Sequence, residues 1–159
     1  GIGKEGMDLT DDDRVVSWLP FYHDMGLVGT LLAPIANQVT TDYLATEAFA
    51  RRPLQWLELI SKNRGTLPYS PTFGHDICAR RASPSKIADL DLSSWRIAGI
   101  GGDMIRADVL TYFQENFKDV GFKPETFVPS YGLAECTLAV SFAQKNKGFE
   151  VDLVDDRVL

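Results

Sequence analysis

Short β-prone runs alternate along this chain with stretches of helical length, and this alternation constrains the fold more than any other feature. Strands are expected at residues 15–20, 39–44, 66–70, 96–100, 127–128 and 137–142. Helices are expected between most of them, at residues 27–36, 53–63, 71–81 and 106–120. Strands that alternate with helices of about 10 to 15 residues form parallel sheets covered by helices. The sequence therefore predicts an α/β fold with a largely parallel sheet flanked by helices.

The last predicted helix carries the clearest pattern. Val109, Phe113 and Phe117 recur at helical spacing, and Gly121 follows them as a stop signal. Residues 82–92, in contrast, are rich in Ser, Asp and Pro, so a connecting loop is predicted there.

Size, charge and cysteine usage narrow the class of protein. The 159 residues amount to about one domain. A net charge of −6 argues against nucleic acid or an anionic membrane as the main partner. No apolar run approaches the roughly 18 residues that a transmembrane segment needs. Cys78 and Cys136 lack the spacing of a zinc site, so we interpret them as reduced thiols of a cytoplasmic protein.

Both ends of the sequence suggest that it is a segment of a longer sequence. The sequence opens on Gly1 instead of Met, and it stops at residues 155–159 just as another β-like run begins. We therefore expect residues 1–159 to be a single α/β fragment of a longer protein.

Three predicted loops follow predicted strands, at residues 21–26, 101–103 and 130–135. In open α/β sheets the carboxyl ends of parallel strands lie at one edge, and ligands bind along that edge. The three loops are therefore candidates for a single binding site.

The third loop holds the most suggestive residues. Tyr131 and Gly132 are expected just past the end of a strand, where the ring could offer a flat face to a heterocycle. Glu135 could supply an oxygen ligand to a hard cation such as Mg²⁺. The alternative is a turn glycine, a half-buried tyrosine and a glutamate at a helix start. Both interpretations are open from these residues alone.

The other two loops also allow two interpretations each. Gly101 and Gly102 could let a planar ligand lie against bare backbone, or they could simply form a turn. His23 could contact an anionic group or gate a tunnel, or it could be a loop histidine bonded to its neighbours. His75 forms no triad signature and no nucleophile-elbow serine occurs, which argues against a hydrolase.

Taken together, four segments resemble one known family. They are residues 17–27 (SWLPFYHDMGL), 90–96 (LDLSSWR), 101–103 (GGD) and 131–137 (YGLAECT). In this order and spacing they are similar to fatty acyl-AMP ligases, which are relatives of long-chain fatty acyl-CoA synthetases among the adenylate-forming enzymes. The resemblance extends over about residues 14–142. It implies that the chain is a central α/β piece of the large N-terminal domain of such an enzyme.

The resemblance also implies an activity. The family activates a fatty acid with ATP and Mg²⁺, which yields an acyl-adenylate and pyrophosphate, and the acyl group then passes to an acyl carrier protein or to coenzyme A. The phosphate loop and the C-terminal domain with its catalytic lysine are expected outside this chain. The chain alone is therefore expected to be inactive. The alternatives are a piece of a fatty acyl-CoA synthetase and a non-catalytic α/β binding module.

The resemblance assigns the family's nucleotide-binding roles to the matching residues of this chain. The resemblance implies that Tyr131 stacks on adenine and that Glu135 is a catalytic residue that coordinates Mg²⁺. It assigns the rest of the nucleotide pocket to Gly101, Gly102, Asp103, Gly132, Leu133 and Ala134.

The same comparison implies an acyl channel. His23, a second catalytic candidate, would border this channel near the reacting carboxylate together with Met25 and Gly26. The segment from Tyr69 to Phe73, which includes Pro71, would help to form its wall.

Two positions depart from the family pattern. Many relatives carry a threonine where this chain has Ala134, and its absence removes a hydroxyl that meets phosphate. The family more often has Gly-Ala-Glu where this chain has Gly101-Gly102-Asp103. Which atom the shorter acid reaches is left open by the sequence.

Overall fold

The computed structural model describes residues 7–155 and residue 157, and within these ranges the strands form two sheets. The smaller sheet pairs β1 (Arg14–Ser17) in parallel with β2 (Thr40–Tyr43). The larger sheet has the order β3-β4-β5-β6. Its strands are β3 (Tyr69–Ser70), β4 (Ala98–Ile100), β5 (Phe127–Leu133) and β6 (Leu138–Phe142).

All neighbouring strands are parallel except the last pair, because β6 returns antiparallel to β5. The backbone links the two sheets. The carbonyl oxygen of Arg14 accepts hydrogen bonds from Thr66 (2.9 Å) and Leu67 (3.1 Å), next to β3. The predicted α/β class with a largely parallel sheet is confirmed, in the form of two linked sheets that end in one hairpin.

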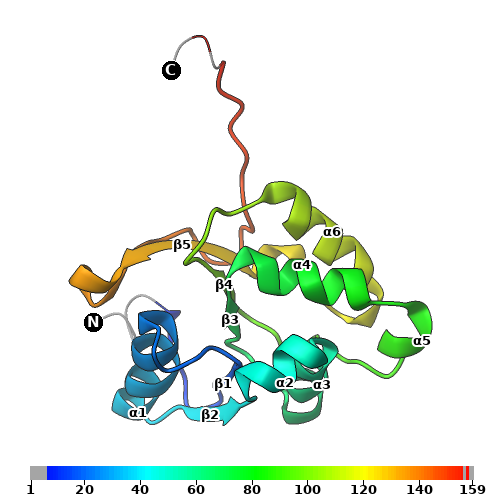
Figure 1. Ribbon diagram of the computed structural model, residues 1–159, viewed down its shortest axis with the longest axis horizontal. Coiled ribbons are helices and arrows are strands. Elements are labelled where there is room, and N and C mark those ends of the chain that lie inside the picture. Colours follow the sequence, from blue (N-terminus) through cyan, green and yellow to red (C-terminus); the bar gives the residue numbers. More distant parts are fainter. Residues whose placement is uncertain (1–6, 156, 158–159) are drawn as a thin grey trace.

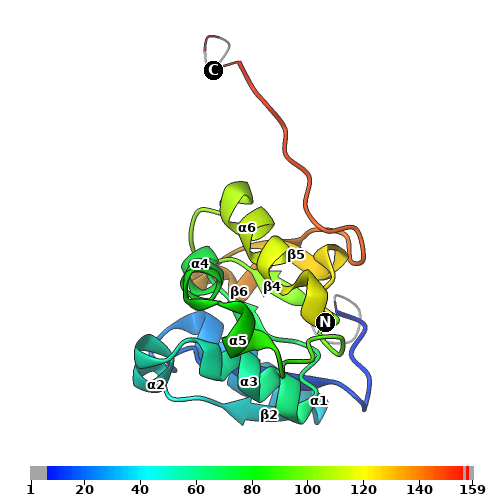
Figure 2. The ribbon, with the colours of Figure 1, turned by 90° about the vertical axis from the view of Figure 1, so that its right-hand side faces the viewer.

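Helices cover these sheets (Figure 1). They are α1 (Ala33–Asn37), α2 (Thr46–Arg51), α3 (Leu54–Asn63), α4 (Thr72–Arg81), α5 (Pro84–Ile87) and α6 (Ala107–Phe117). Figure 2 shows α4 and α6 in the upper half of the view, near β4 and β5, and α2, α3 and β2 in the lower half. Among the described residues, no helix combines the length and apolar character needed to cross a membrane.

The core joins these layers through buried aromatic rings. Trp56, Trp95, Phe113 and Phe127 are at most 2% exposed, and their ring centroids lie 5.0–6.2 Å from that of His75. Burial lowers the pKa of His75 to about 4, against the smaller opposing effects of the Pro71 carbonyl and of Asp103. His75 is therefore a neutral core residue, which agrees with its lack of a triad signature.

Several predicted boundaries were wrong. The first strand ends at Ser17 and not at residue 20, and the helix predicted at 27–36 begins earlier, as a π-helix over Met25–Leu32 (η2) that continues into α1. The stretch 82–92, predicted as a loop, contains the single turn α5. Helix α2 was not predicted, because its small and polar residues give no clear apolar stripe.

The most informative error concerns Tyr131 and Gly132. They lie inside β5 and not in a turn after it, since the strand runs to Leu133. β6 supplies the pairing that prolongs the strand, with Tyr131 opposite Ser141 and an irregularity between Tyr131 and Gly132.

Candidate functional site

A cavity of about 450 Å³ lies between the β5–β6 hairpin and the segment of η2 and α1. All three sequence-predicted loops reach it, since His23, Gly102 and Tyr131 line the same space. The prediction that these remote loops meet at one site therefore agrees with the structure.

Most of the predicted site residues lie at this cavity, but some do not. Eight of them line it: His23, Met25, Gly101, Gly102, Tyr131, Gly132, Leu133 and Ala134. Five described residues are absent from the lining: Gly26, Pro71, Phe73, Asp103 and Glu135. The roles assigned to all thirteen remain predictions.

Close backbone packing explains the two glycines after β4. A Cβ atom on Gly101 would lie 2.8 Å from the carbonyl oxygen of Ser130 in β5, a distance that real Cβ atoms do not show. Gly102 has φ +81°, a conformation that favours glycine, and it faces the methyl group of Met25. The turn thus brings bare backbone to the cavity at the place where β4, β5 and η2 meet.

His23 is held by its own neighbours. Its Nδ1 lies 2.8 Å from Oδ1 of Asp24, and the backbone N–H of Met25 donates to that oxygen (2.7 Å) and to Nδ1 (3.1 Å). Half of the His23 side chain is exposed. This loop histidine is thus bonded to its neighbours and also borders the cavity, and its contact with an anionic group remains a prediction.

The hairpin places an exposed aromatic ring beside these groups. Tyr131 is 63% exposed although it lies within a paired strand, so one part of its surface remains available to a ligand. Gly132 sits against the carbonyl oxygen of Leu138, and a side chain there would collide with it. The hairpin requires a glycine at this point.

Glu135 is exposed on the 3-10 turn Ala134–Cys136, next to the cavity but outside its lining. Among the described residues, no group of three or more His, Cys, Asp or Glu side chains could hold a metal ion by itself.

Asp103 does not line this cavity, and its predicted role in the nucleotide pocket remains a prediction. Its carboxylate accepts hydrogen bonds from the backbone N–H of Thr72 (Oδ1, 2.9 Å) and of Phe73 (Oδ2, 3.3 Å), at the start of α4. This answers which atoms the shorter acid reaches.

The predicted channel residues of this region also lie elsewhere. Phe73 is 48% exposed and packs edge-on against Trp18, Pro71 is buried, and Gly26 packs against the carbonyl oxygen of Pro20. Tyr69, the first residue of the predicted wall segment, does line the cavity. Apolar side chains that were not predicted form much of the remaining wall: Met7, Val15, Leu67, Leu138 and Phe142.

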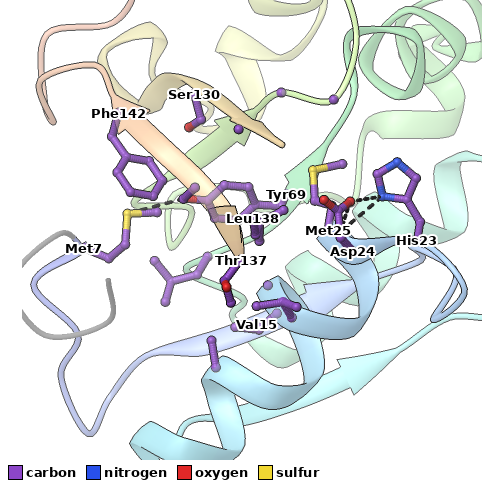
Figure 3. Close-up of a pocket in the computed structure, with 18 of the residues that line it drawn as sticks. Met7, Val15, His23, Asp24, Met25, Tyr69, Ser130, Thr137, Leu138 and Phe142 are labelled. Atoms are coloured by element: carbon purple, nitrogen blue, oxygen red, sulfur yellow. Dashed lines mark hydrogen bonds and ion pairs between the residues drawn. The ribbon is translucent and has the colours of Figure 1, made fainter. Parts of the chain in front are cut away.

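The cavity is apolar at one end and polar at the other. Figure 3 shows Met7 and Phe142 on one side of the view, His23, Asp24 and Met25 on the opposite side, and Tyr69 and Leu138 between them. The hydroxyl of Tyr69 donates to the sulfur of Met7 (3.4 Å), and burial raises the pKa of this phenol. Such a cavity suits a ligand with an apolar body and a polar or anionic head.

Comparisons with known proteins point in the same direction. Residues 2–156 match the family described as AMP-binding enzyme. A Caulobacter vibrioides protein with the provisional name acyl-CoA synthetase is 50% identical over 154 residues, which cover 97% of this chain and 27% of that protein. The medium-chain-fatty-acid–[acyl-carrier-protein] ligase TtuA of Teredinibacter turnerae is 44% identical over 79% of this chain and 20% of its own length.

A solved structure from work on the fatty acyl-adenylate ligases of E. coli and L. pneumophila superimposes with a TM-score of 0.90. It is 56% identical in sequence, and the match covers 92% of this chain and 26% of that one. The chain therefore spans about a quarter of the length of the proteins that it resembles.

Proposed function

The chain belongs to the AMP-binding enzyme family, and from this premise we propose that it is part of a ligase that activates a fatty acid with ATP. The products are an acyl-adenylate and pyrophosphate, and the acyl group then passes to an acyl carrier protein. The observation that carries this proposal is the single cavity that joins an apolar wall to His23, to the Gly101–Gly102 turn and to Tyr131. The names of the similar proteins, fatty acyl-adenylate ligase and fatty-acid–[acyl-carrier-protein] ligase, support it.

The apolar end of the cavity suits the hydrocarbon chain of the acid. Burial of each CH₂ group contributes about 0.8 kcal/mol, so a wall that includes Met7 and Phe142 gives affinity that grows with chain length. The carboxylate then lies toward His23. The Nδ1 atom of His23 is occupied by its neighbours, which leaves Nε2 to donate a hydrogen bond to negative charge at the reacting centre.

The glycine turn and the hairpin suit the nucleotide. The exposed ring of Tyr131 offers a face on which adenine stacks. Backbone N–H and C=O groups of Gly101 and Gly102 can read the edge of the base, because no side chain stands in the way. Gly132, Leu133 and Ala134 continue the same rim.

The exposed carboxylate of Glu135 fits a role in Mg²⁺ binding. This ion is usually held by one or two carboxylates together with substrate phosphates and water, so a set of several protein ligands is not required. Mg²⁺ supplies positive charge that offsets the repulsion between a carboxylate and phosphate oxygens. In this proposal Glu135 contributes one oxygen ligand from the turn Ala134–Cys136.

The proposal also names the acceptor of the acyl group and the cellular compartment. Transfer to coenzyme A in place of a carrier protein is the alternative within enzymes, and a non-catalytic binding module is the alternative outside them. The free thiols of Cys78 and Cys136 favour the cytoplasm. Because the chain spans about a quarter of its relatives, we propose that the isolated 159 residues form a single piece of an adenylation domain that does not catalyse the reaction alone.

The test uses the full-length enzyme that contains this chain. ATP–pyrophosphate exchange is measured with fatty acids of several lengths, with and without Mg²⁺, and the product is then offered a carrier protein or coenzyme A. Exchange that depends on the fatty acid and on Mg²⁺, followed by loading of the carrier, is expected. Loading of coenzyme A alone would favour the synthetase alternative, and lack of any exchange would contradict the proposal.

A further inference from the structure

Helix α4 begins without a capping side chain of its own. Its N-cap residue is Pro71, which has no side-chain oxygen, and its first turn holds no acidic residue. The first backbone N–H groups of a helix need acceptors, and a carboxylate is favourable there because of the helix dipole. The acceptor is Asp103, which reaches Thr72 and Phe73 from the loop after β4, some thirty residues further along the chain.

The same loop presents Gly101 and Gly102 to the cavity. Gly102 lacks a side chain and has φ +81°, so local backbone preference alone does not fix its conformation. On one side the turn is bounded by Ser130 and Met25. On the other side Asp103 ties it to α4, which is itself anchored in the core through His75 and its neighbouring rings.

We infer that Asp103 is a positioning residue. Its carboxylate caps α4 and thereby holds the Gly101–Gly102 turn in the shape that a nucleotide requires, and it does not itself contact adenine or ribose. This inference rests on the proposed function. A carboxylate turned toward a ligand would leave the N–H of the buried Thr72 without its acceptor, which is costly.

Two substitutions separate a cap from a ligand contact. Asp103→Ala removes both acceptor oxygens, whereas Asp103→Asn keeps one, and Asn caps helices about as well as Asp. If Asp103 acts as a cap, Asp103→Asn is therefore expected to keep most of the nucleotide affinity that Asp103→Ala loses. A role that depends on the negative charge predicts equal damage from both.

A third substitution removes the donor and leaves Asp103 intact. Thr72→Pro deletes the N–H group that donates to Oδ1. Proline suits the first position of a helix, and Pro71 has ψ 161°, which a residue before proline readily adopts. The buried hydroxyl of Thr72 has no hydrogen-bond partner among the described residues, so its loss breaks no bond.

The full-length enzyme and these variants are compared by ATP–pyrophosphate exchange and by the affinity for AMP. Asp103→Ala is expected to raise the KM for ATP and the Kd for AMP about three- to tenfold, the scale of a lost helix cap, with little change in kcat. Thr72→Pro is expected to give part of this effect. The double variant should be no worse than Asp103→Ala, because both changes break one interaction. Asp108→Ala is the control, since this exposed aspartate on α6 forms its ion pair with Arg106 and does not line the cavity.

Three results would overturn the inference. An equal loss of nucleotide affinity in Asp103→Asn and Asp103→Ala would indicate that Asp103 contacts the ligand directly. Additive effects of Thr72→Pro and Asp103→Ala would indicate the same. A lower melting temperature with unchanged KM and Kd would reduce it to a structural cap. If Asp103→Ala does not fold, the Asn and Pro variants carry the comparison. Absence of exchange in the wild type refutes the proposed function instead, and AMP binding still tests the inference.

Discussion

The buried His75 makes a sharp prediction about stability and pH. Its ring is fully buried among Trp56, Trp95 and Phe113, its Nδ1 lies 3.3 Å from the Pro71 carbonyl oxygen, and its Nε2 has no partner among the described residues. Burial lowers its pKa from 6.5 to about 4. Between these two values the unfolded chain binds a proton that the folded chain does not.

The sign and the size follow from this difference. Stability from a neutral His75 is complete above about pH 6.5 and is lost as the pH falls toward 4. One pKa unit corresponds to 1.36 kcal/mol, so the free energy of unfolding drops by about 2 kcal/mol at pH 5 and by about 3 kcal/mol at pH 4.

The variant His75→Leu removes the titrating group at similar volume. At pH 7 it is expected to be less stable than the wild type by about 1–2 kcal/mol, because it loses the bond to Pro71 and several ring contacts. Toward pH 5 this gap should close or reverse. Urea unfolding of both proteins at about pH 7, 6 and 5 gives the difference in their free energies of unfolding. The other titrating groups are the same in both proteins, so their contributions cancel in this difference. A gap that stays constant across this range would refute a buried, neutral His75.

Three further predictions concern the site in the full-length enzyme. Glu135→Gln should lower Mg²⁺-dependent acyl-adenylate formation by at least about tenfold with the melting temperature unchanged, and an unaltered rate would remove Glu135 from the metal role. His23→Ala should lower the rate of the same step, by about ten- to a hundredfold, and normal kinetics with every chain length would leave His23 a simple loop residue. Gly102→Ala should cost about 1–2 kcal/mol in urea unfolding through its positive φ alone, because the added Cβ meets Met25 at an ordinary 3.4 Å; no change in stability would mean that the turn adopts another conformation.

Local sequence patterns predicted the layers of the fold but not all of its pairings. The helical spacing of Val109, Phe113 and Phe117 marks the buried face of α6, and these residues are indeed buried. The misplacement of Tyr131 has a non-local cause. Its strand continues only because β6 pairs with it, and a short β-prone run gives no sign of where its partner ends.

The site was predicted to a similar extent. Loops that follow parallel strands meet at one edge, and this rule brought His23 and Gly102 to one cavity, whereas Tyr131 reaches the cavity from within β5. This rule does not predict in which direction a side chain within such a loop points. Asp103 points to α4 because that helix lacks a cap, which only the proline at its N-cap hints at in the sequence. The apolar wall combines residues as distant as Met7 and Phe142, which no local pattern connects.

The position of β6 bears on how this segment behaves by itself. Among the described residues, β6 pairs with β5 on one side and has no strand on the other, and Val140 within it is 53% exposed. An open strand edge with outward apolar groups is a template on which further chains add. The segment expressed alone is therefore expected to self-associate through this edge, and a lysine in place of Val140 would keep it dispersed.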